Sequence, residues 1–471
     1  MRSLETIAMR KFSLSDQLDF AKFSCDINPI HIDPIAARRT LHGECMVHGM
    51  HALLWALEQL TIKTDYKLSE LKARFSNPLV LNCDTKCLLD KELKKITLMQ
   101  NGSICTSIAF ILADTQPNLL EKKLLPRSLK AADVSFESFS VGNEFDFKLY
   151  RDESYKNVPF PELSRIYGDI FVAEIAGLSQ LVGMECPGKH SLFAAVTLSL
   201  SNKNKISRYK VLKMDDRLNL IHLEVFGLSF NALLECFFRP KPVVNIEYRE
   251  CLKLVSKGEF SNVNALIIGG SRGLGECTAK LISAGGGKSF ITYCQGADDA
   301  TTVKQDINAL NGFCESFPLN IAEIEDVNPN FKDLAINQLY YFASPKITME
   351  KESEFETKKN VYIKFYCDYF KMLANKLITE IDELSIFYPS TAFIDEKNNG
   401  FKNYIEAKLA GEAICKELAI SNLGLNVMSP RLPALQTDQN QSIAGRPHHV
   451  EKNAYVLLPY IRKMNDFNKQ D

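Results

Sequence analysis

The sequence lacks long apolar runs and an excess of charge of either sign. No run reaches the roughly 20 apolar residues that cross a bilayer, and the N-terminal MRSLETIAMRKFSLSDQ lacks the apolar centre of a signal peptide. The formal net charge of -1, with 24% charged residues, excludes a global attraction to nucleic acid or anionic lipid. We therefore expect a cytoplasmic protein with no membrane span and no nucleic-acid partner.

Zinc-binding cysteine patterns are also missing. The thirteen cysteines include no C-x-x-C pair, and they are scattered through apolar contexts such as Cys236 and Cys367, which favours buried, reduced thiols. Cys83 and Cys87 lie four positions apart in strand-like sequence, but two thiols do not complete a tetrahedral site. We expect no metal ion.

Residues 1–245 alternate strand-like runs with two helical stretches. Residues 47–60, VHGMHALLWALEQL, place apolar side chains at helical spacing, which predicts a deeply packed helix. A weaker version spans residues 169–188. Asn101-Gly102 separates two β-rich arms and supplies the positive φ angles of a tight hairpin turn. A buried helix followed by antiparallel strands therefore occurs twice.

The pattern changes in the second half of the chain. Pro240 and Pro242 end the sheet pattern, and from Val263 short apolar strands alternate with helices, which is typical of a parallel α/β sheet. The candidate strands are residues 265–269, 289–293, 338–342, 384–388 and 425–429. A chain of 471 residues exceeds the size of one core. We expect three domains, at residues 1–125, 126–245 and 258–471.

Residues 26–31, DINPIH, combine an acid, a turn and a histidine. Asn28 and Pro29 turn the chain, so Asp26 and His31 can converge although they lie five positions apart. This stretch resembles the D-x-N-P-x-H signature of MaoC-like (R)-specific enoyl-thioester hydratases, and residues 47–50, VHGM, resemble that family's second block. The resemblance implies an α+β double hot-dog fold over the N-terminal half.

The same resemblance implies an acid–base pair. Dehydration of a 3-hydroxyacyl thioester, or the reverse, needs one group to move the α-proton and another to manage the water, and Asp26 and His31 take these roles. A backbone N–H near Gly49, at the start of the buried helix, is placed to stabilise the enolate oxygen. Taken singly, Asp26 reads as a turn residue and His31 as a surface histidine. A metal site that adds His48 and His51 is a further alternative, which no HExxH spacing supports.

The match departs from the family at one position. The small Gly commonly found before the catalytic Asp is Cys25 here. Residues 126–245 carry no D-x-N-P-x-H stretch, so we expect this segment to complete the fold and to help form an acyl tunnel. Its turn at residues 186–190, CPGKH, is interpreted as structural.

A glycine-rich loop follows the first strand of the C-terminal part. Gly269, Gly273 and Gly275 stand between a strand and a helix, where glycines let the backbone approach a pyrophosphate at the helix N-terminus. Further along, Tyr404 and Lys408 form a Y-x-x-x-K pair that one helical turn places on the same face. Loop and pair together resemble the short-chain dehydrogenases/reductases. The resemblance implies an α/β Rossmann-type doubly wound parallel sheet.

The roles of the site residues follow from this resemblance. Tyr404 would protonate a carbonyl oxygen, and Lys408 would lower the phenol pKa and contact the nicotinamide ribose. A hydroxyl about 13 residues before Tyr404 should polarise the carbonyl; Ser390 and Thr391 are candidates, and we prefer Ser390. The cofactor loop consists of Gly269, Ser271, Arg272, Gly273, Leu274 and Gly275.

Charge around the loop favours NADP(H). Residues 292–295, TYCQ, end the second strand without the acid that binds a free 2′-hydroxyl, whereas Arg272 can meet a 2′-phosphate. The alternative is that Arg272 is a solvated loop cation. Two features depart from the family: residues 342–345, FASP, replace its N-N-A-G, and residues 362–364, YIK, stand where it carries an Asn.

The two resemblances predict a bifunctional enzyme of fatty-acyl or polyketide-like biosynthesis. It would reduce a 3-oxoacyl thioester with NADPH and dehydrate the resulting (R)-3-hydroxyacyl thioester, with coenzyme A or acyl carrier protein as the carrier. One alternative is a single-activity dehydratase whose second part is a nucleotide-binding scaffold. Another is an oxidative hydratase/3-hydroxyacyl-CoA dehydrogenase of β-oxidation type. Homo-oligomerisation stays open.

Overall fold

The computed structural model describes most of the chain and divides it into two compact units. The described residues are 4–64, 67–113, 125–126, 131–151, 159–201, 204–324, 331–350, 355–396, 399–438 and 452–467. Unit 1 is formed by Met1–Lys241, and unit 2 by most residues from Pro242 onward. The expected boundary between residues 125 and 126 falls in a stretch that lies largely outside the described residues.

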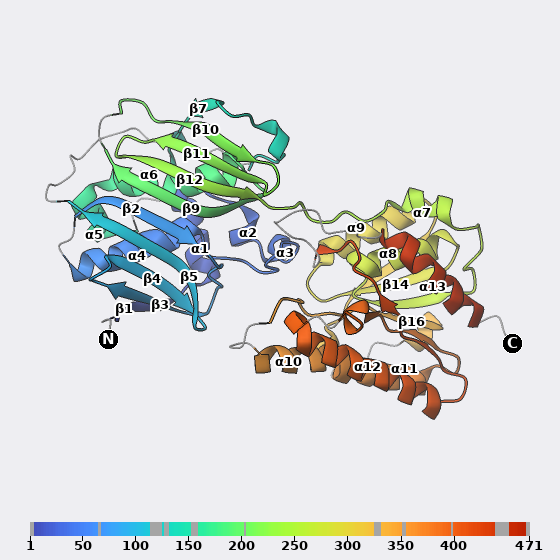
Figure 1. The fold of residues 1–471 in the computed structure, drawn as a ribbon. Coiled ribbons are helices and arrows are strands. Elements are labelled where there is room, and N and C mark those ends of the chain that lie inside the picture. The colour runs from blue at the N-terminus through green and yellow to red at the C-terminus, as the bar shows by residue number, and fades with distance from the viewer. Residues whose placement is uncertain are drawn as a thin grey trace. The chain divides into compact units, whose positions relative to one another are not determined.

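Unit 1 is built on one antiparallel sheet, to which each half of the unit contributes five neighbouring strands (Figure 1). In sheet order the strands are β1 (Leu4–Lys11), β3 (Asp84–Asp90), β4 (Lys95–Gln100), β5 (Ser103–Leu112), β2 (Leu68–Phe75), β9 (Ser191–Leu200), β12 (Phe230–Phe238), β11 (Leu220–Phe226), β10 (Arg208–Asp215) and β7 (Glu144–Asp146). β2 and β9 join the halves in antiparallel register, with Glu70 opposite Ser199. A separate short pair consists of β6 (Leu125–Pro126) and β8 (Tyr150–Arg151).

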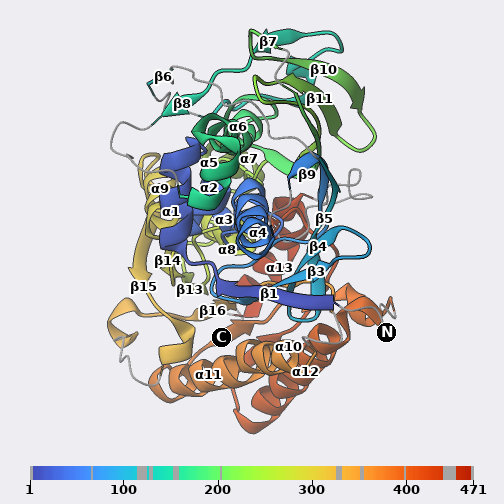
Figure 2. The same cartoon turned by 90° about the vertical axis from the view of Figure 1, so that its left-hand side faces the viewer.

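Two helices, one from each half, pack against one face of this sheet (Figures 1 and 2). They are α4 (Gly49–Lys63) and α6 (Asp169–Gln180), and α6 continues as a π-helical turn at Leu181–Glu185. The two helices touch each other, which explains why α4 is buried on nearly all sides. Both predicted helices are confirmed. The remaining helices of unit 1 are α1 (Leu14–Ser24), α2 (Pro29–Ile32), α3 (Pro34–Ala37) and α5 (Pro161–Tyr167).

Among the described residues, no single helix is long and apolar enough to cross a bilayer. Only α5 and the α6 stretch together reach that length and hydropathy, and a bend of 118° separates them.

The hairpin between β4 and β5 forms where the sequence predicts it. Asn101 and Gly102 have φ angles of 48° and 74°, and Gln100 pairs with Ser103 across the turn. Positive φ at both central residues matches the twist of the flanking strands. The hairpin prediction is confirmed.

Unit 2 is built on a parallel sheet of six strands. In sheet order they are β15 (Phe313–Pro318), β14 (Lys288–Tyr293), β13 (Asn264–Ile268), β16 (Gln338–Tyr341), β17 (Ser385–Phe387) and β19 (Asn426–Met428). The five predicted strands are present. β15 was missed because it lies at the sheet edge, where its polar residues face solvent and break the apolar run.

Helices cover both faces of the parallel sheet, with a separate hydrophobic core under each layer. One core includes Leu281 and Leu457, and the other includes Leu373 and Leu418. The helices of unit 2 are α7 (Tyr248–Leu254), α8 (Gly273–Ala284), α9 (Ala297–Asn308), α10 (Phe355–Ile363), α11 (Tyr369–Glu380), α12 (Lys402–Ser421) and α13 (Asn453–Phe467). A short pair is formed by β18 (Ser390–Thr391) and β20 (Arg431–Leu432). In the sequence, β18 follows β17 and β20 follows β19.

Candidate active sites

The loop after α1 brings the acid and the histidine of unit 1 together. Cys25 ends α1 with a φ of 60°, in the left-handed region where glycine is favoured, so the backbone turn is made even though the Gly is absent. Asn28 then caps α2, and Pro29 is the first residue of that helix. The side chains of Asp26 and His31 therefore project from the two ends of one tight turn.

Asp26 is almost fully buried and is held by two donors. The Ser179 hydroxyl donates to Oδ2 at 2.7 Å, and the Asn28 N–H donates to Oδ1 at 3.1 Å. Burial raises the pKa of Asp26, while the charge of His31 and these donors oppose the rise. The carboxyl is thus fixed in position and can hold a proton more readily than a solvated carboxyl.

His31 has one ring nitrogen available as a base. Its Nδ1 lies 2.9 Å from the Met46 carbonyl oxygen, which is only an acceptor, so the neutral ring carries its hydrogen on Nδ1 and leaves Nε2 unprotonated. Burial lowers the pKa of His31, and the Asp26 charge partly offsets this. His31 therefore stays neutral at neutral pH.

His48 stacks on His31 with ring centroids 3.9 Å apart and completes a group with metal-ligand chemistry. Oxygen and nitrogen atoms of Asp26, His31 and His48 lie within 4.8 Å of one another. Both nitrogens of the His48 ring lie near acceptor oxygens, 3.0 Å from Gln17 Oε1 and 3.1 Å from the Asp26 carbonyl oxygen. The group could hold a cation only if His48 gave up its Asp26 contact.

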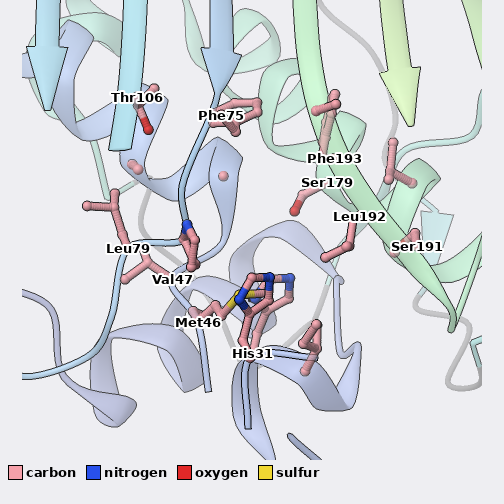
Figure 3. A pocket seen from close by; sticks show the side chains of 18 of the residues that line it. His31, Met46, Val47, Phe75, Leu79, Thr106, Ser179, Ser191, Leu192 and Phe193 are labelled. Carbon is pink, nitrogen blue, oxygen red and sulfur yellow. Dashed lines mark hydrogen bonds between the residues drawn. The ribbon is translucent and has the colours of Figure 1, made fainter. Parts of the chain in front are cut away.

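The two halves of unit 1 enclose a cavity of about 250 Å³ beside these residues. Figure 3 shows Met46, Val47 and Leu79 on one side and Ser179, Leu192 and Phe193 on the other. The lining residues are Asp26, Ile30, His31, His42, Met46, Val47, Gly49, Ala52, Phe75, Ser76, Asn77, Pro78, Leu79, Thr106, Ser179, Val182, Gly183, Ser191, Leu192, Phe193, Ala194 and Phe237. Most of the residues that line the cavity are apolar, and Asp26, His31 and Ser179 are among its polar ones.

Gly49 is the first residue of α4 and lines this cavity. Amides of a helix's first turn have no partner within the helix, so they are free to bind a developing negative charge. A Cβ on Gly49 would come within 3.3 Å of the Phe75 ring, which makes glycine the fitting residue here.

The second half contributes residues that the sequence reasoning missed. Ser179 of α6 donates to Asp26, and the Asn28 amide donates to the carbonyls of Gly183 at 3.0 Å and Lys189 at 3.2 Å. Gly183 packs against the carboxylate so closely that a Cβ would lie 2.3 Å from Oδ1. The only sequence signal was a glycine within an apolar helical run, which points to a close approach.

In unit 2 the glycine loop is tightly packed. Gly269 has a φ of 78°, Gly273 has a φ of 60° and begins α8, and a Cβ on Gly275 would lie 2.3 Å from the Gly269 carbonyl oxygen. Ser271 is buried, and Leu274 packs on the core. The loop keeps bulk away from the N-terminus of α8, which is the property that a pyrophosphate requires.

Arg272 forms an ion pair that the sequence did not predict. Its Nη1 lies 3.4 Å from Asp438 Oδ2, and the Arg272 side chain is 32% exposed. An acid at this distance competes with a 2′-phosphate for the guanidinium.

Tyr404, on the first turn of α12, has Thr391 rather than Ser390 as its hydroxyl partner. The Thr391 side chain hydrogen bonds with Tyr404. Ser390 instead donates to Glu412 Oε1 at 2.6 Å, because its side chain leaves β18 on the opposite side from its neighbour. The preference for Ser390 is therefore replaced by Thr391 as the residue beside the tyrosine.

Lys408 faces inward, as its spacing from Tyr404 requires, but it is turned toward protein groups. Its Nζ donates to the Pro389 carbonyl at 2.7 Å and lies 4.0 Å above the Tyr366 ring. Burial lowers the pKa of Lys408 to about 7, and burial raises the pKa of Tyr404 to about 12. The expected lowering of the phenol pKa is not seen, because desolvation dominates at Tyr404.

Comparisons with known proteins give one family match and a set of structural likenesses. Residues 2–101 match the family model described as the MaoC like domain. No curated protein matches the chain. Solved structures that match part of this chain include a short chain dehydrogenase from Burkholderia cenocepacia J2315 in complex with NADP, 19% identical, covering 44% of this chain and 91% of that one, TM-score 0.39. Another is the Short Chain Dehydrogenase from Shigella flexneri, 16% identical, covering 46% and 90%, TM-score 0.40.

The family match covers the loop from Asp26 to His31 and the start of α4, so the resemblance read from D-x-N-P-x-H is confirmed for this part of the chain. Residues 2–101 are a MaoC-like domain.

Proposed function

We propose that unit 1 is a double hot-dog enzyme that interconverts (R)-3-hydroxyacyl and enoyl thioesters. The observation that carries this proposal is the meeting of Asp26, His31 and the Gly49 end of α4 at one cavity. A buried carboxyl beside a neutral imidazole supplies both an acid and a base to one small substrate.

From this geometry we assign the steps of dehydration, with Asp26 acting in its protonated form. His31 Nε2 takes the proton from Cα, and the electron pair moves onto the thioester oxygen, where the Gly49 N–H stabilises it. The enolate then expels the 3-hydroxyl, which takes a proton from Asp26 and leaves as water. Hydration runs the same steps in reverse, and proton exchange between His31 and Asp26 restores the starting pair.

The test is hydration of crotonyl thioesters by the full chain. Asp26→Asn and His31→Ala should each lower the rate by at least on the order of a hundredfold. Arg217→Gln, at an exposed turn of the same unit, is a matched control that should keep the wild-type rate. Near-normal rates in both site variants would overturn the assignment.

For unit 2 we propose an NADPH-dependent 3-oxoacyl-thioester reductase. Its strand order is third, second, first, fourth, fifth, sixth in the chain, the order of dinucleotide-binding Rossmann folds, and its glycine loop fits a pyrophosphate. Bound NADPH would supply a hydride to the carbonyl carbon. Tyr404 would give its proton to the carbonyl oxygen, and the Thr391 hydroxyl would orient that oxygen.

One observation favours a second candidate for unit 2, a nucleotide-binding scaffold without turnover. The Lys408 ammonium is already engaged by protein groups, because it donates to the Pro389 carbonyl and packs on the Tyr366 ring. Titration with NADPH and NADH, followed by turnover assays with 3-oxoacyl thioesters on both carriers, separates the candidates. Binding without turnover favours the scaffold, and tighter binding of NADPH than NADH supports the reading of Arg272.

A further inference from the structure

Arg239 is a buried arginine without an acidic partner. It follows β12, is 7% exposed, and its backbone N–H donates to the His190 carbonyl at 2.7 Å. One terminal nitrogen of the guanidinium donates to the Lys189 carbonyl at 2.7 Å, whereas Nε is buried and has no hydrogen-bond partner. Within the described part of the chain no carboxylate pairs with it, and burial alone lowers its pKa to about 10. A guanidinium removed from water in this way is unfavourable unless an anion joins it.

Two lysines extend this positive charge to the surface. Lys241 Nζ lies 2.7 Å and Lys189 Nζ 3.7 Å from the carboxylate of Asp133, which also faces His190. The lysine side chains are about half exposed, whereas Arg239 is inside. Asp133 is therefore shared by the two lysines and His190 and does not pair with Arg239. We call Arg239, Lys189 and Lys241 the cationic cluster.

The cationic cluster lies beside the catalytic loop and the cavity. The Lys189 carbonyl that accepts from Arg239 also accepts from Asn28, which stands between Asp26 and His31. Ser191 and Phe237, each two residues from a member of the cluster, line the cavity. The positive charge of the cationic cluster therefore lies beside the cavity, where it can contact the part of a ligand that extends from the cavity toward solvent.

We propose that the cationic cluster, with Arg239 at its inner end, binds a phosphate ester of the thioester's carrier. This inference rests on the function proposed for unit 1. A cavity of about 250 Å³ holds a short acyl thioester but not a whole carrier, so the rest of the carrier must pass an opening. Both coenzyme A and the prosthetic group of a carrier protein bear a phosphate on their pantetheine arm. A guanidinium with an unpartnered edge, flanked by lysines, matches that group.

The experiment compares three crotonyl thioesters on the full chain, with coenzyme A, 4′-phosphopantetheine and pantetheine as carriers. Arg239→Gln should lower kcat/KM at least tenfold for the two phosphorylated carriers, mainly through KM, and leave the pantetheine thioester within twofold. Arg239→Lys should retain part of the preference because it keeps the charge. Lys213→Gln, an exposed cation of β10, is the matched control and should change none of the three.

The pattern across carriers identifies the phosphate. A loss with both phosphorylated carriers assigns the pantetheine phosphate, and a loss with coenzyme A alone assigns its nucleotide phosphates. An equal loss with all three carriers would show that Arg239 only supports the Asn28 loop, and would overturn the inference. Calorimetric titration with coenzyme A separates this result from failure of the proposed function. If the wild type hydrates no thioester, at least tenfold weaker coenzyme A binding by Arg239→Gln still supports the cluster, and equal binding overturns it.

Discussion

Residues from both halves of unit 1 hold the Asp26 carboxyl group in place. Asn28 and Ser179 donate to its two oxygens, and the backbone of Gly183 lies against it. If Asp26 is the acid that we propose, a carboxyl held this tightly keeps one orientation toward the substrate, and such positioning supplies a large part of the rate. Its geometry therefore depends on residues more than 150 positions away in the sequence.

Gly183→Ala should lower crotonyl-thioester hydration by about a hundredfold, because small displacements of a positioned group have effects of that size. The new Cβ would lie 2.3 Å from Asp26 Oδ1, and the carboxylate cannot retreat without losing Ser179. Gly177→Ala in α6 is the control, since its Cβ would meet the movable end of Leu149. Equal rates for the two variants would contradict this account.

Ser179→Ala should raise the pKa of Asp26 further, because it removes a donor that favours the charged carboxylate. The limb of the kcat/KM pH profile that belongs to Asp26 should move upward by about one pH unit. Ser191→Ala, which alters another hydroxyl of the cavity, should leave the profile in place. A profile that keeps its shape in Ser179→Ala would show that this hydroxyl is only structural.

At the scale of elements, α12 carries the inward-facing groups of unit 2. Tyr404 and Lys408 lie one turn apart, and the π-helical turn at Lys364–Asp368 places Tyr366 against both of them. Lys408 also lies 4.8 Å from the centre of the Tyr388 ring. The lysine is therefore enclosed by aromatic rings, and the loss of water lowers its pKa.

The burial of Lys408 predicts a stability that depends on pH. Its pKa is about 7 in the folded protein and 10.5 when solvated, so between these values the unfolded chain binds a proton that the folded chain does not. The free energy of unfolding should rise with pH across this window, by about 1.4 kcal/mol per pH unit from this group.

Lys408→Met should flatten this rise, as measured by urea unfolding followed by circular dichroism. Fluorescence of Trp55, the single tryptophan, reports on unit 1 and should be unaffected. Lys416→Met, on the exposed side of α12, should keep the wild-type slope. An unchanged slope in Lys408→Met would mean that the ammonium stays charged in its aromatic surroundings.

At the scale of the molecule, the two sites belong to separate units with their own cores. Chemistry in one unit should then be separable from chemistry in the other. If the product of one site is the substrate of the other site, it would have to dissociate and bind again unless the protein keeps the carrier bound between the two steps.

Tyr404→Phe should abolish NADPH oxidation with a 3-oxoacyl thioester, because the proton donor is lost, and it should leave enoyl-thioester hydration at the wild-type rate. Tyr455→Phe, an exposed tyrosine of α13, should affect neither assay. The bifunctional proposal fails if NADPH oxidation persists in Tyr404→Phe. It also fails if the wild type oxidises no NADPH with 3-oxoacyl thioesters of short and medium chain length.

The sequence by itself determined the elements whose signals are local. A 3.6-residue apolar repeat predicts α4, a two-residue turn predicts the β4–β5 hairpin, and apolar runs predict the inner parallel strands. The D-x-N-P-x-H stretch likewise identifies Asp26 and His31, because a tight turn joins them. All of these depend on residues close together in the chain.

Only the tertiary structure decided what depends on distant residues. Ser179 and Gly183 reach Asp26 because α6 packs on α4. Thr391, and not Ser390, faces Tyr404 because of the way β18 packs against α12. The edge strand β15 had too little apolar surface to show in the sequence. The contacts of Lys408 with Pro389 and Tyr366, and the buried Arg239 Nε without a hydrogen-bond partner, likewise result from burial. Burial is fixed by packing between segments, so no local pattern encodes it.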